Sequence, residues 1–488
     1  MNDDRSLERA ARSWIEAGPT RAPESAVAAA LQLIETTSQE RDLRIPWRTP
    51  RMNRFALAGA AVALLVVVAV GGSLGLGWLP IVAPPGSTGT PGPSQPSPTV
   101  SSPTITDSPS PPSSTTMPVT TGRFVPAGSL VEGRAYHSAL ALQDGRVLVV
   151  GGEASHSRSS RGFLDSIEIW DPASNEFTAS GGMQRVTWGD QVEGPSLFRM
   201  VDGRTLLVPT GCECRSPGTT PAQVWDPVSG AKPLENVLVR GNGFTTIQLS
   251  SGGILVAGGV VDPVYDANTA AEVWDPIADA IEPTGPLGHA RIDAVATLLK
   301  DGRVLILGGF DRVGGDLDYV DVAVPEAEIW NPASGTFSTA FTFEIGPGPS
   351  VRRGHRVSAL TLLDGRVLVV DEAGGRVWDP VANTLSEAGT FRETRREFTA
   401  TLLADGRVLV AGGKQTVPDG GGSPTASTEL WDPSTSRFEP GPELAEARAG
   451  HTATLLADGR VLIVGGYRAG SGLDGVLLAE LWEPVPGP

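Results

Sequence analysis

The sequence predicts an all-β fold, a seven-bladed β-propeller, over residues 122–488 of a 488-residue chain. An element of the form DGRVLVVGG, first seen at 144–152, occurs seven times, and its later copies begin at Asp202, Ser251, Asp301, Asp364, Asp405 and Asp458. A second element, Trp-Asp-Pro or a close variant, alternates with it, and its copies begin at Trp170, Trp225, Trp274, Trp330, Trp378, Trp431 and Trp482. Repeats of about 40–50 residues with strand-like patterns are typical of propellers. The many glycines (60) and prolines (41) also favour short strands joined by turns.

Each repeat is expected to form four antiparallel strands. The last repeat begins with the alternating run HTATLLA, continues through an Asp-Gly turn and ends its second strand with RVLIVGG. Asp-Gly between apolar runs is a strong hairpin signal because both turn positions need positive φ. The tryptophan of the third strand is large enough to fill the gap between neighbouring blades. The propeller starts with a fourth-strand pattern and ends with a third-strand pattern, so residues 123–130 should complete the blade built from 448–485.

Three segments precede the predicted propeller. Residues 1–54 carry apolar residues at helical spacing and are expected to form short helices. Residues 55–79 contain no charge and are long enough to span a bilayer. Residues 80–121 are rich in Pro, Ser and Thr, which is typical of a disordered, extended stalk. Arginines gather before the uncharged segment and no basic residue follows it until Arg123, so we expect a single-pass cell-membrane protein with a cytoplasmic N-terminus and an extracytoplasmic propeller.

Charge and cysteine content exclude several classes of function. The net charge is −17, and nucleic acid is therefore not expected as a partner, because phosphate binding needs a concentrated basic surface. Cys212 and Cys214 are too few for a disulfide framework or a four-ligand zinc site. They are either reduced or joined in a tight local disulfide, and redox or copper chemistry is the alternative. An acidic loop could hold calcium or be merely solvated; its acids are Asp311, Asp316, Asp318 and Asp321.

The Gly-Gly doublets, the DGR turns and the Trp-Asp-Pro turns resemble the kelch family of β-propellers, in the variety found in galactose oxidase and its bacterial relatives. That resemblance implies a copper alternative, because an adjacent Tyr-His at the start of a first strand ligates copper there, and Tyr136 and His137 match this position. No tyrosine matches the family's second, cysteine-linked copper ligand, and the family's C-terminal histidine has no counterpart after the last blade. Position 137 is also a repeat position, which is occupied by His451 in the last blade and by Phe244 and Phe398 in others. A packing or channel-rim role is therefore favoured, and no cofactor is expected.

The loops that follow the Gly-Gly doublets and join the blades vary in length, and variable loops on a rigid scaffold often carry binding sites. We place the candidate site on that face. Arginines recur at the start of most first strands, where they could form an anion-recognising rim or bind backbone carbonyls between blades. The candidate rim consists of Arg134, His137, Arg185, Arg291, Arg352, His355, Arg395, Arg448 and His451.

The sequence thus predicts a membrane-anchored propeller that binds a protein or carbohydrate ligand and has no catalytic activity. No Ser-His-Asp context, phosphate loop or HExxH motif is present. Two alternatives remain open. The first is a copper-radical oxidase related to galactose oxidase. The second is a transmembrane regulator whose residues 1–54 hold a cytoplasmic signalling partner such as a sigma factor.

Overall fold

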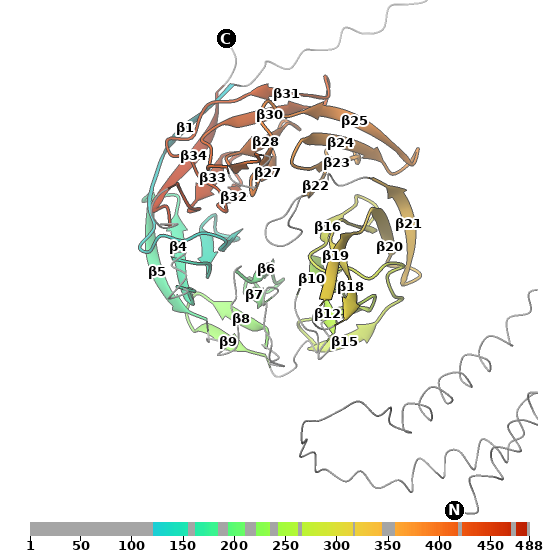
Figure 1. Cartoon of the computed structure of the whole chain (residues 1–488). Helices are drawn as coiled ribbons and strands as arrows, with labels where there is room; N and C mark the ends of the chain where they lie inside the picture. Colours follow the sequence, from blue (N-terminus) through green and yellow to red (C-terminus); the bar gives the residue numbers. More distant parts are fainter. Residues whose placement is uncertain are drawn as a thin grey trace, which may run out of the picture. The chain divides into compact units, whose positions relative to one another are not determined.

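A computed structural model describes residues 121–154, 162–183, 194–209, 221–234, 243–261, 266–315, 318–343, 357–417, 422–469 and 475–485. In these ranges the chain is all-β and forms seven four-stranded antiparallel sheets arranged as the blades of a ring (Figure 1). The predicted helical segment, membrane span and most of the stalk (residues 1–120) lie outside the described residues. Within the described part, no helix has the length and apolar character of a membrane span.

Each blade is a meander of four strands. Blade 1 contains β2 (Ser138–Ala141), β3 (Val147–Val150), β4 (Ser166–Asp171) and β5 (Glu176–Gly182). Blade 2 contains β6 (Ser196–Arg199), β7 (Thr205–Val208), β8 (Gln223–Asp226) and β9 (Gly230–Pro233). Blade 3 contains β10 (Phe244–Gln248), β11 (Ile254–Gly258), β14 (Ala271–Asp275) and β15 (Ala280–Pro283). Blade 4 contains β16 (Val295–Leu298), β17 (Val304–Leu307), β20 (Glu326–Asn331) and β21 (Thr336–Thr342).

The ring continues with the same meander and closes on the first strand of the chain. Blade 5 contains β22 (Ser358–Thr361), β23 (Val367–Val370), β24 (Gly374–Asp379) and β25 (Thr384–Thr390). Blade 6 contains β27 (Thr399–Leu402), β28 (Val408–Ala411), β30 (Thr428–Asp432) and β31 (Arg437–Pro440). Blade 7 combines β32 (Thr452–Leu455), β33 (Val461–Val464) and β34 (Leu478–Val485) with β1 (Thr121–Ser129). The predicted closure by residues 123–130 is confirmed, because Phe124 of β1 lies opposite Trp482 of β34.

The hydrophobic core is divided among the blade interfaces. Seven of its clusters each join two neighbouring blades, and the one between blades 7 and 1 contains Ala127, Val149, Trp170, Leu462 and Leu481. The tryptophans of all seven Trp-Asp-Pro elements are at most 3% exposed. They therefore fill the gaps between blades, as the sequence predicts.

At the Gly-Gly doublets, backbone atoms of the next blade and of the same blade leave no room for a side chain. A Cβ on Gly465 (φ +62°) would lie 2.4 Å from the carbonyl oxygen of Arg134 in the next blade. A Cβ on Gly466 (φ +92°) would lie 2.8 Å from the carbonyl oxygen of Ala449 in its own blade. Only glycine combines this φ with this lack of space, so the doublet recurs for structural reasons.

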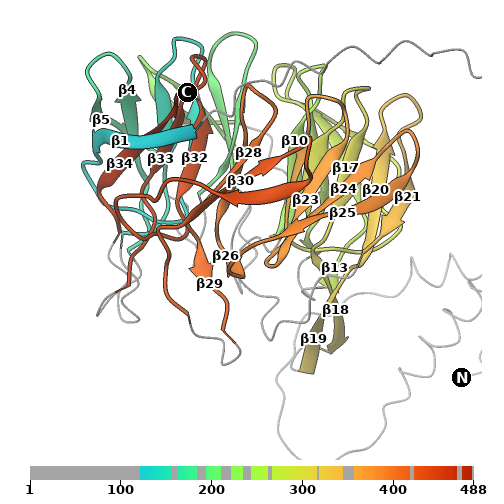
Figure 2. The ribbon, with the colours of Figure 1, turned by 90° about the horizontal axis from the view of Figure 1, so that it is seen from above.

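One face of the ring carries additional short hairpins, whereas the other carries uniform turns. The hairpins pair β12 (Val260–Val261) with β13 (Asp266–Ala267), and β18 (Phe310–Gly315) with β19 (Asp318–Ala323). A third short sheet pairs β26 (Arg395–Arg396) with β29 (Lys414–Gln415). Figure 2 shows β18, β19 and β29 extending from the same side of the ring. We call this side the variable face, and the opposite side the DG face, after its Asp-Gly turns.

Candidate functional site

Four of the predicted rim arginines lie in the interior of their blades. Arg134, Arg291, Arg395 and Arg448 are at most 1% exposed. Each donates a hydrogen bond from its guanidinium to a buried glutamate on the third strand of its own blade, and the partners are Glu168, Glu328, Glu429 and Glu480. The distances between the paired nitrogen and oxygen atoms are 2.5 to 2.8 Å. These four guanidinium groups are thus paired inside the protein and do not lie at the expected rim.

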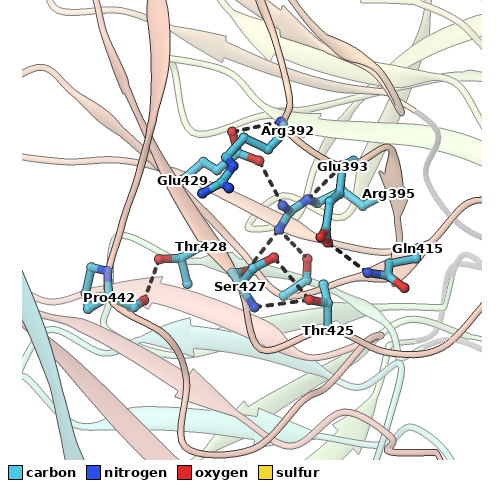
Figure 3. Close-up of polar contacts among 10 residues, drawn as sticks. Arg392, Glu393, Arg395, Gln415, Thr425, Ser427, Thr428, Glu429 and Pro442 are labelled. Atoms are coloured by element: carbon cyan, nitrogen blue, oxygen red, sulfur yellow. Dashed lines mark hydrogen bonds and ion pairs between the residues drawn. The ribbon is translucent and has the colours of Figure 1, made fainter.

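The surroundings of Arg395 show what such an arginine connects (Figure 3). Its Nη2 donates to Glu429 Oε1 at 2.8 Å, while its Nη1 donates to the carbonyl oxygens of Ser427 at 2.9 Å and Gly412 at 3.3 Å. The other oxygen of Glu429 accepts a hydrogen bond from the backbone N–H of Arg392 at 3.3 Å. The arginine therefore fastens the start of a blade to the glycine doublet and the third strand. This role agrees with the predicted alternative in which these side chains bind backbone carbonyls.

The remaining rim arginines, Arg185 and Arg352, and also His355, Cys212 and Cys214, lie outside the described residues. Blade 5 departs from the arginine–glutamate pattern in its third strand, because Arg376 occupies the position of the glutamate. Its Nη1 donates to Asp371 Oδ2 at 2.9 Å, and its Nε lies 3.4 Å from Glu387 Oε1. In blade 5, the third-strand residue is thus the arginine of an ion pair with Asp371 instead of the glutamate.

His137 and His451 occupy equivalent places at the two interfaces of the closing blade. His137 Nε2 lies 2.8 Å from Thr452 Oγ1, and His451 Nε2 lies 3.0 Å from Thr399 Oγ1, so each histidine bonds to a threonine of the preceding blade. Both side chains are buried, with residue exposures of 5% and 6%. Burial, helped by the charge of Arg448, lowers the pKa of His451 to about 3, and burial followed by Arg134 lowers the pKa of His137 well below its usual range. Both imidazoles are therefore neutral at physiological pH.

A different group of polar side chains gathers where the innermost strands begin on the variable face. The Tyr136 hydroxyl donates to Glu397 Oε2 at 2.8 Å, and the Tyr467 hydroxyl donates to the same oxygen at 2.6 Å. The two tyrosine rings are 5.8 Å apart between centroids. We call Tyr136, Glu397 and Tyr467 the axial cluster. It brings together blades 1, 6 and 7.

Two members of the axial cluster occupy the same position of the repeat, and the backbone is strained there. Tyr136 (φ +54°) and Glu397 (φ +57°) adopt the left-handed backbone conformation, and so does Asp293 (φ +54°) at the same position of blade 4. Blades 3 and 7 have Gly243 and Gly450 there, also with positive φ. A left-handed conformation costs a non-glycine residue about 1–2 kcal/mol, and such strain is concentrated at functional sites in proteins.

The backbone explains why this conformation recurs. The N–H of Tyr136 donates to the carbonyl of Gly450 at 2.8 Å, and the N–H of Gly450 donates to the carbonyl of Glu397 at 3.1 Å. Equivalent bonds join Asp293 to Gly243 and Gly194 to Tyr136. Successive blades are thus linked at their innermost points. The ring of Tyr136 passes over Gly450, where an added Cβ would lie 3.0 Å from Tyr136 Cε1.

The electrostatics of the axial cluster keep its phenols protonated. Burial, followed by the charge of Glu397, raises the pKa of Tyr136 and of Tyr467 far above the usual value. Arg396 Nε lies 3.7 Å from Glu397 Oε1 and offsets the carboxylate charge. The cluster therefore consists of two protonated phenols that share one carboxylate oxygen beside an ion pair, with Tyr467 4% exposed and the Glu397 side chain 9% exposed.

Sequence reasoning identified Tyr136 but not its partners. Glu397 is 261 residues away in the chain, and Tyr467 directly follows the Gly-Gly doublet of the last blade, so no local pattern links either residue to Tyr136. A usable signal existed in the column one residue before the His/Phe position, which reads Tyr136, Gly194, Gly243, Asp293, Glu397 and Gly450 in the described blades. A large or charged residue at a repeat position that is glycine in other blades suggests that its side chain has a function.

The described residues do not assemble a copper site of the expected kind. Copper(II) favours nitrogen ligands in a tetragonal arrangement, but His137 is bonded to Thr452 between two blades, while the Tyr136 hydroxyl is bonded to Glu397. Only oxygen atoms meet in the axial cluster. In the acidic loop, Asp321 pairs with Arg312 at 3.0 Å. Among the described residues, no three His, Cys, Asp or Glu side chains lie close enough to hold a metal ion.

Comparison with known proteins supports the fold. No protein-family model matches the chain, and no curated protein matches it. Among solved structures, it is similar to a fungal alcohol oxidase of the AA5 family in complex with copper, with a TM-score of 0.54 and 17% identity over 75% of this chain and 76% of that one. The chain is therefore a seven-bladed propeller with a galactose-oxidase-like fold, as its motifs predict. At this identity, the likeness shows the fold alone.

Proposed function

We propose that this protein is a binding propeller whose axial cluster recognises a carbohydrate on the variable face. The observation that carries the proposal is the left-handed Tyr136, whose ring crosses Gly450 and whose hydroxyl is held by Glu397 at 2.8 Å. A strained aromatic residue that is fixed at both ends is a pre-organised platform, and a ligand that stacks on it loses little free energy in ordering the protein. Aromatic platforms of this kind suit the apolar face of a sugar ring.

The charge balance of the cluster favours a neutral ligand with many hydroxyl groups. Arg396 offsets the charge of Glu397, so neither a cation nor an anion gains a strong net attraction. Carboxylate and phenol oxygens can accept hydrogen bonds from sugar hydroxyls. Among the ligands expected from the sequence, a carbohydrate therefore fits this chemistry better than a charged peptide.

Membrane anchoring through residues 55–79 is a separate part of the proposal. The uncharged segment and the arginines that precede it support a cytoplasmic N-terminus, with the propeller outside the cell. In that arrangement, residues 1–54 are free to hold a cytoplasmic regulator. Protease added to intact cells should then degrade the propeller, and a protected propeller would show that the orientation is reversed.

The binding proposal is tested by titrating the full-length chain with neutral cello-, xylo-, manno- and chito-oligosaccharides in a calorimeter. We expect at least one series to bind, and we expect Tyr136→Phe and Glu397→Gln each to weaken it about tenfold. Tyr136→Phe removes the bond that fixes the platform, and Glu397→Gln replaces a charged acceptor with a weaker neutral one. Glu387→Gln is the matched control, since this carboxylate is 79% exposed on the outer strand β25. No binding in the whole panel, or equal binding by both variants, would contradict the proposal.

A second experiment on the same protein distinguishes binding from copper-radical catalysis, the alternative that the resemblance to galactose oxidase implies. Copper loading followed by metal analysis should leave no stoichiometric copper on the wild-type chain. Tightly held copper that is lost in Tyr136→Phe would favour the oxidase alternative instead.

A further inference from the structure

A pocket of about 420 Å³ lies on the DG face, between the inner strands of blades 1, 2 and 3. Its apolar wall consists of Leu140, Leu197, Met200 and Val201, and its polar lining includes Arg199 and Gln248. Val201 is 74% exposed, so the apolar wall of the pocket reaches the protein surface. The axial cluster lies on the other face, so this pocket is independent of the proposed carbohydrate site. We call it the Arg199 pocket.

Arg199 differs from the other arginines near the Asp-Gly turns. In six blades the arginine of the DGR turn pairs with the aspartate of its own turn at 2.6 to 2.8 Å, as Arg204 does with Asp202. Arg199 donates from Nη2 to the carbonyl oxygen of Ala141 and has no carboxylate partner among the described residues. A guanidinium carries five N–H donors, so most of its donors remain available to a ligand on an otherwise acidic protein.

The repeat itself does not require a charge at this position. The equivalent residues in other blades include Gln248, Leu298 and Thr361. Two of these equivalents contribute neutral contacts of the same kind, because Gln248 Nε2 donates to the carbonyl of Arg199 at 2.7 Å and Thr361 Oγ1 donates to that of Leu298 at 2.8 Å. A neutral side chain can thus make the bond between blades. The charge of Arg199 is therefore left without a structural explanation.

We propose that the Arg199 pocket binds an aliphatic carboxylate, with the carboxylate on the Arg199 guanidinium and the hydrocarbon against the apolar wall. A guanidinium pairs with a carboxylate through two parallel hydrogen bonds. Arg199 is the only cation among the pocket's lining residues, so a single negative charge is matched better than a doubly charged phosphate. Each methylene removed from water strengthens binding about fourfold, so the affinity should rise with chain length.

The test is calorimetric titration of the full-length chain with octanoate, octan-1-ol and acetate. We expect octanoate to bind at least tenfold more tightly than the other two, because octan-1-ol lacks the charge and acetate lacks the chain. Arg199→Gln should weaken octanoate binding about tenfold or more and leave octan-1-ol binding unchanged. Val201→Ser should weaken octanoate several-fold and leave acetate unchanged.

Arg437→Gln is the matched control, since Arg437 is an exposed arginine on the outer strand of blade 6, and this variant should bind octanoate like the wild type. The proposal is overturned if octanoate binds no better than acetate, or if Arg199→Gln binds octanoate as the wild type does. Because the carbohydrate titration uses other ligands and residues of the opposite face, either proposal can fail while the other stands.

Discussion

The buried histidines make the stability of the propeller sensitive to acid. His137 and His451 are neutral in the folded protein because burial lowers the pKa of each imidazole, to about 3 for His451. In the unfolded chain both imidazoles take up a proton below about pH 6.5. The unfolded state then binds more protons than the folded state, so the free energy of unfolding falls as the pH falls from about 6.5 toward the folded pKa.

This effect gives a measurable slope. Each histidine should remove about 1.4 kcal/mol of stability per pH unit below pH 6.5, or about 2 kcal/mol at pH 5. His137→Phe and His451→Phe should each remove about half of the slope that the two histidines cause, because each variant removes one of the two imidazoles. Phenylalanine should fit, since Phe244 and Phe398 occupy the same repeat position. Urea unfolding at pH 7.5, 6 and 5 measures it. If the double variant loses stability in parallel with the wild type, the histidines are not its cause.

Single residues also show which parts of the site could be predicted. Asp-Gly hairpins, glycine doublets and tryptophans were predictable because turn chemistry and large apolar volume act within a few residues. The expected positive φ at both turn positions was wrong, since Gly145 has it (φ +87°) and Asp144 does not. The partners of Tyr136 were not, because Glu397 and Tyr467 reach it from blades 6 and 7. Only the closed ring brings these residues together. The glutamate partners of the buried arginines were missed for a similar reason, since Glu168 lies 34 residues from Arg134.

At the scale of the elements, the arginine–glutamate pairs of blades 1, 4, 6 and 7 hold the first, second and third strands of each of these blades in one arrangement. Arg395 contacts Glu429, Gly412 and Ser427, which belong to three parts of blade 6 (Figure 3). Breaking a buried ion pair by removing one partner leaves an uncompensated buried charge and typically costs 3–5 kcal/mol. An exposed ion pair contributes at most about 1 kcal/mol.

Arg395→Ala should therefore lower the free energy of unfolding by about 3–5 kcal/mol. Arg460→Ala is the control, because its pair with Asp458 is partly exposed at an Asp-Gly turn, and it should cost less than about 1 kcal/mol. Urea unfolding of both variants gives the comparison. An unchanged midpoint for Arg395→Ala would return this arginine to the list of groups available to a ligand.

The strands on the variable face were not predicted, because the sequence indicated only loops of variable length there. The long segment 310–325 contains the hairpin β18–β19, and the segment 414–427 contains β29, which pairs with β26. These strands have no regular repeat, so the hydrophobic periodicity that reveals the blades gives no signal for them. The arrangement of the blades follows from the repeat, whereas the details of the binding face depend on contacts between distant segments.

For the whole molecule, the ring is closed by the start of the chain. β1 pairs with β34 along seven residue pairs and covers what would otherwise be the open edge of blade 7. β1 contributes Ala127, and the next residue after the strand, Leu130, also joins the cluster between blades 7 and 1. The carbonyl of Ala127 accepts a hydrogen bond from Trp170 Nε1 at 3.0 Å. β1 thus fastens the last blade to the first.

A chain that begins at Glu132 should therefore lose cooperative unfolding and associate, whereas a chain that begins at Thr121 should stay monomeric. Without β1, Trp170 loses its hydrogen-bond partner, Leu130 no longer fills the interface, and β34 exposes an unpaired edge that can pair with another chain. Losing Leu130 alone removes about 1.5–3 kcal/mol of burial, a large share of the 5–15 kcal/mol that stabilises a typical domain. Light scattering and urea unfolding of the two chains test this.

Adding a peptide of residues 121–131 to the shorter chain should restore the monomer, because the peptide supplies the missing strand. Equal midpoints for the two chains without peptide would show that the seven blade interfaces, and not the closing strand, hold the ring together.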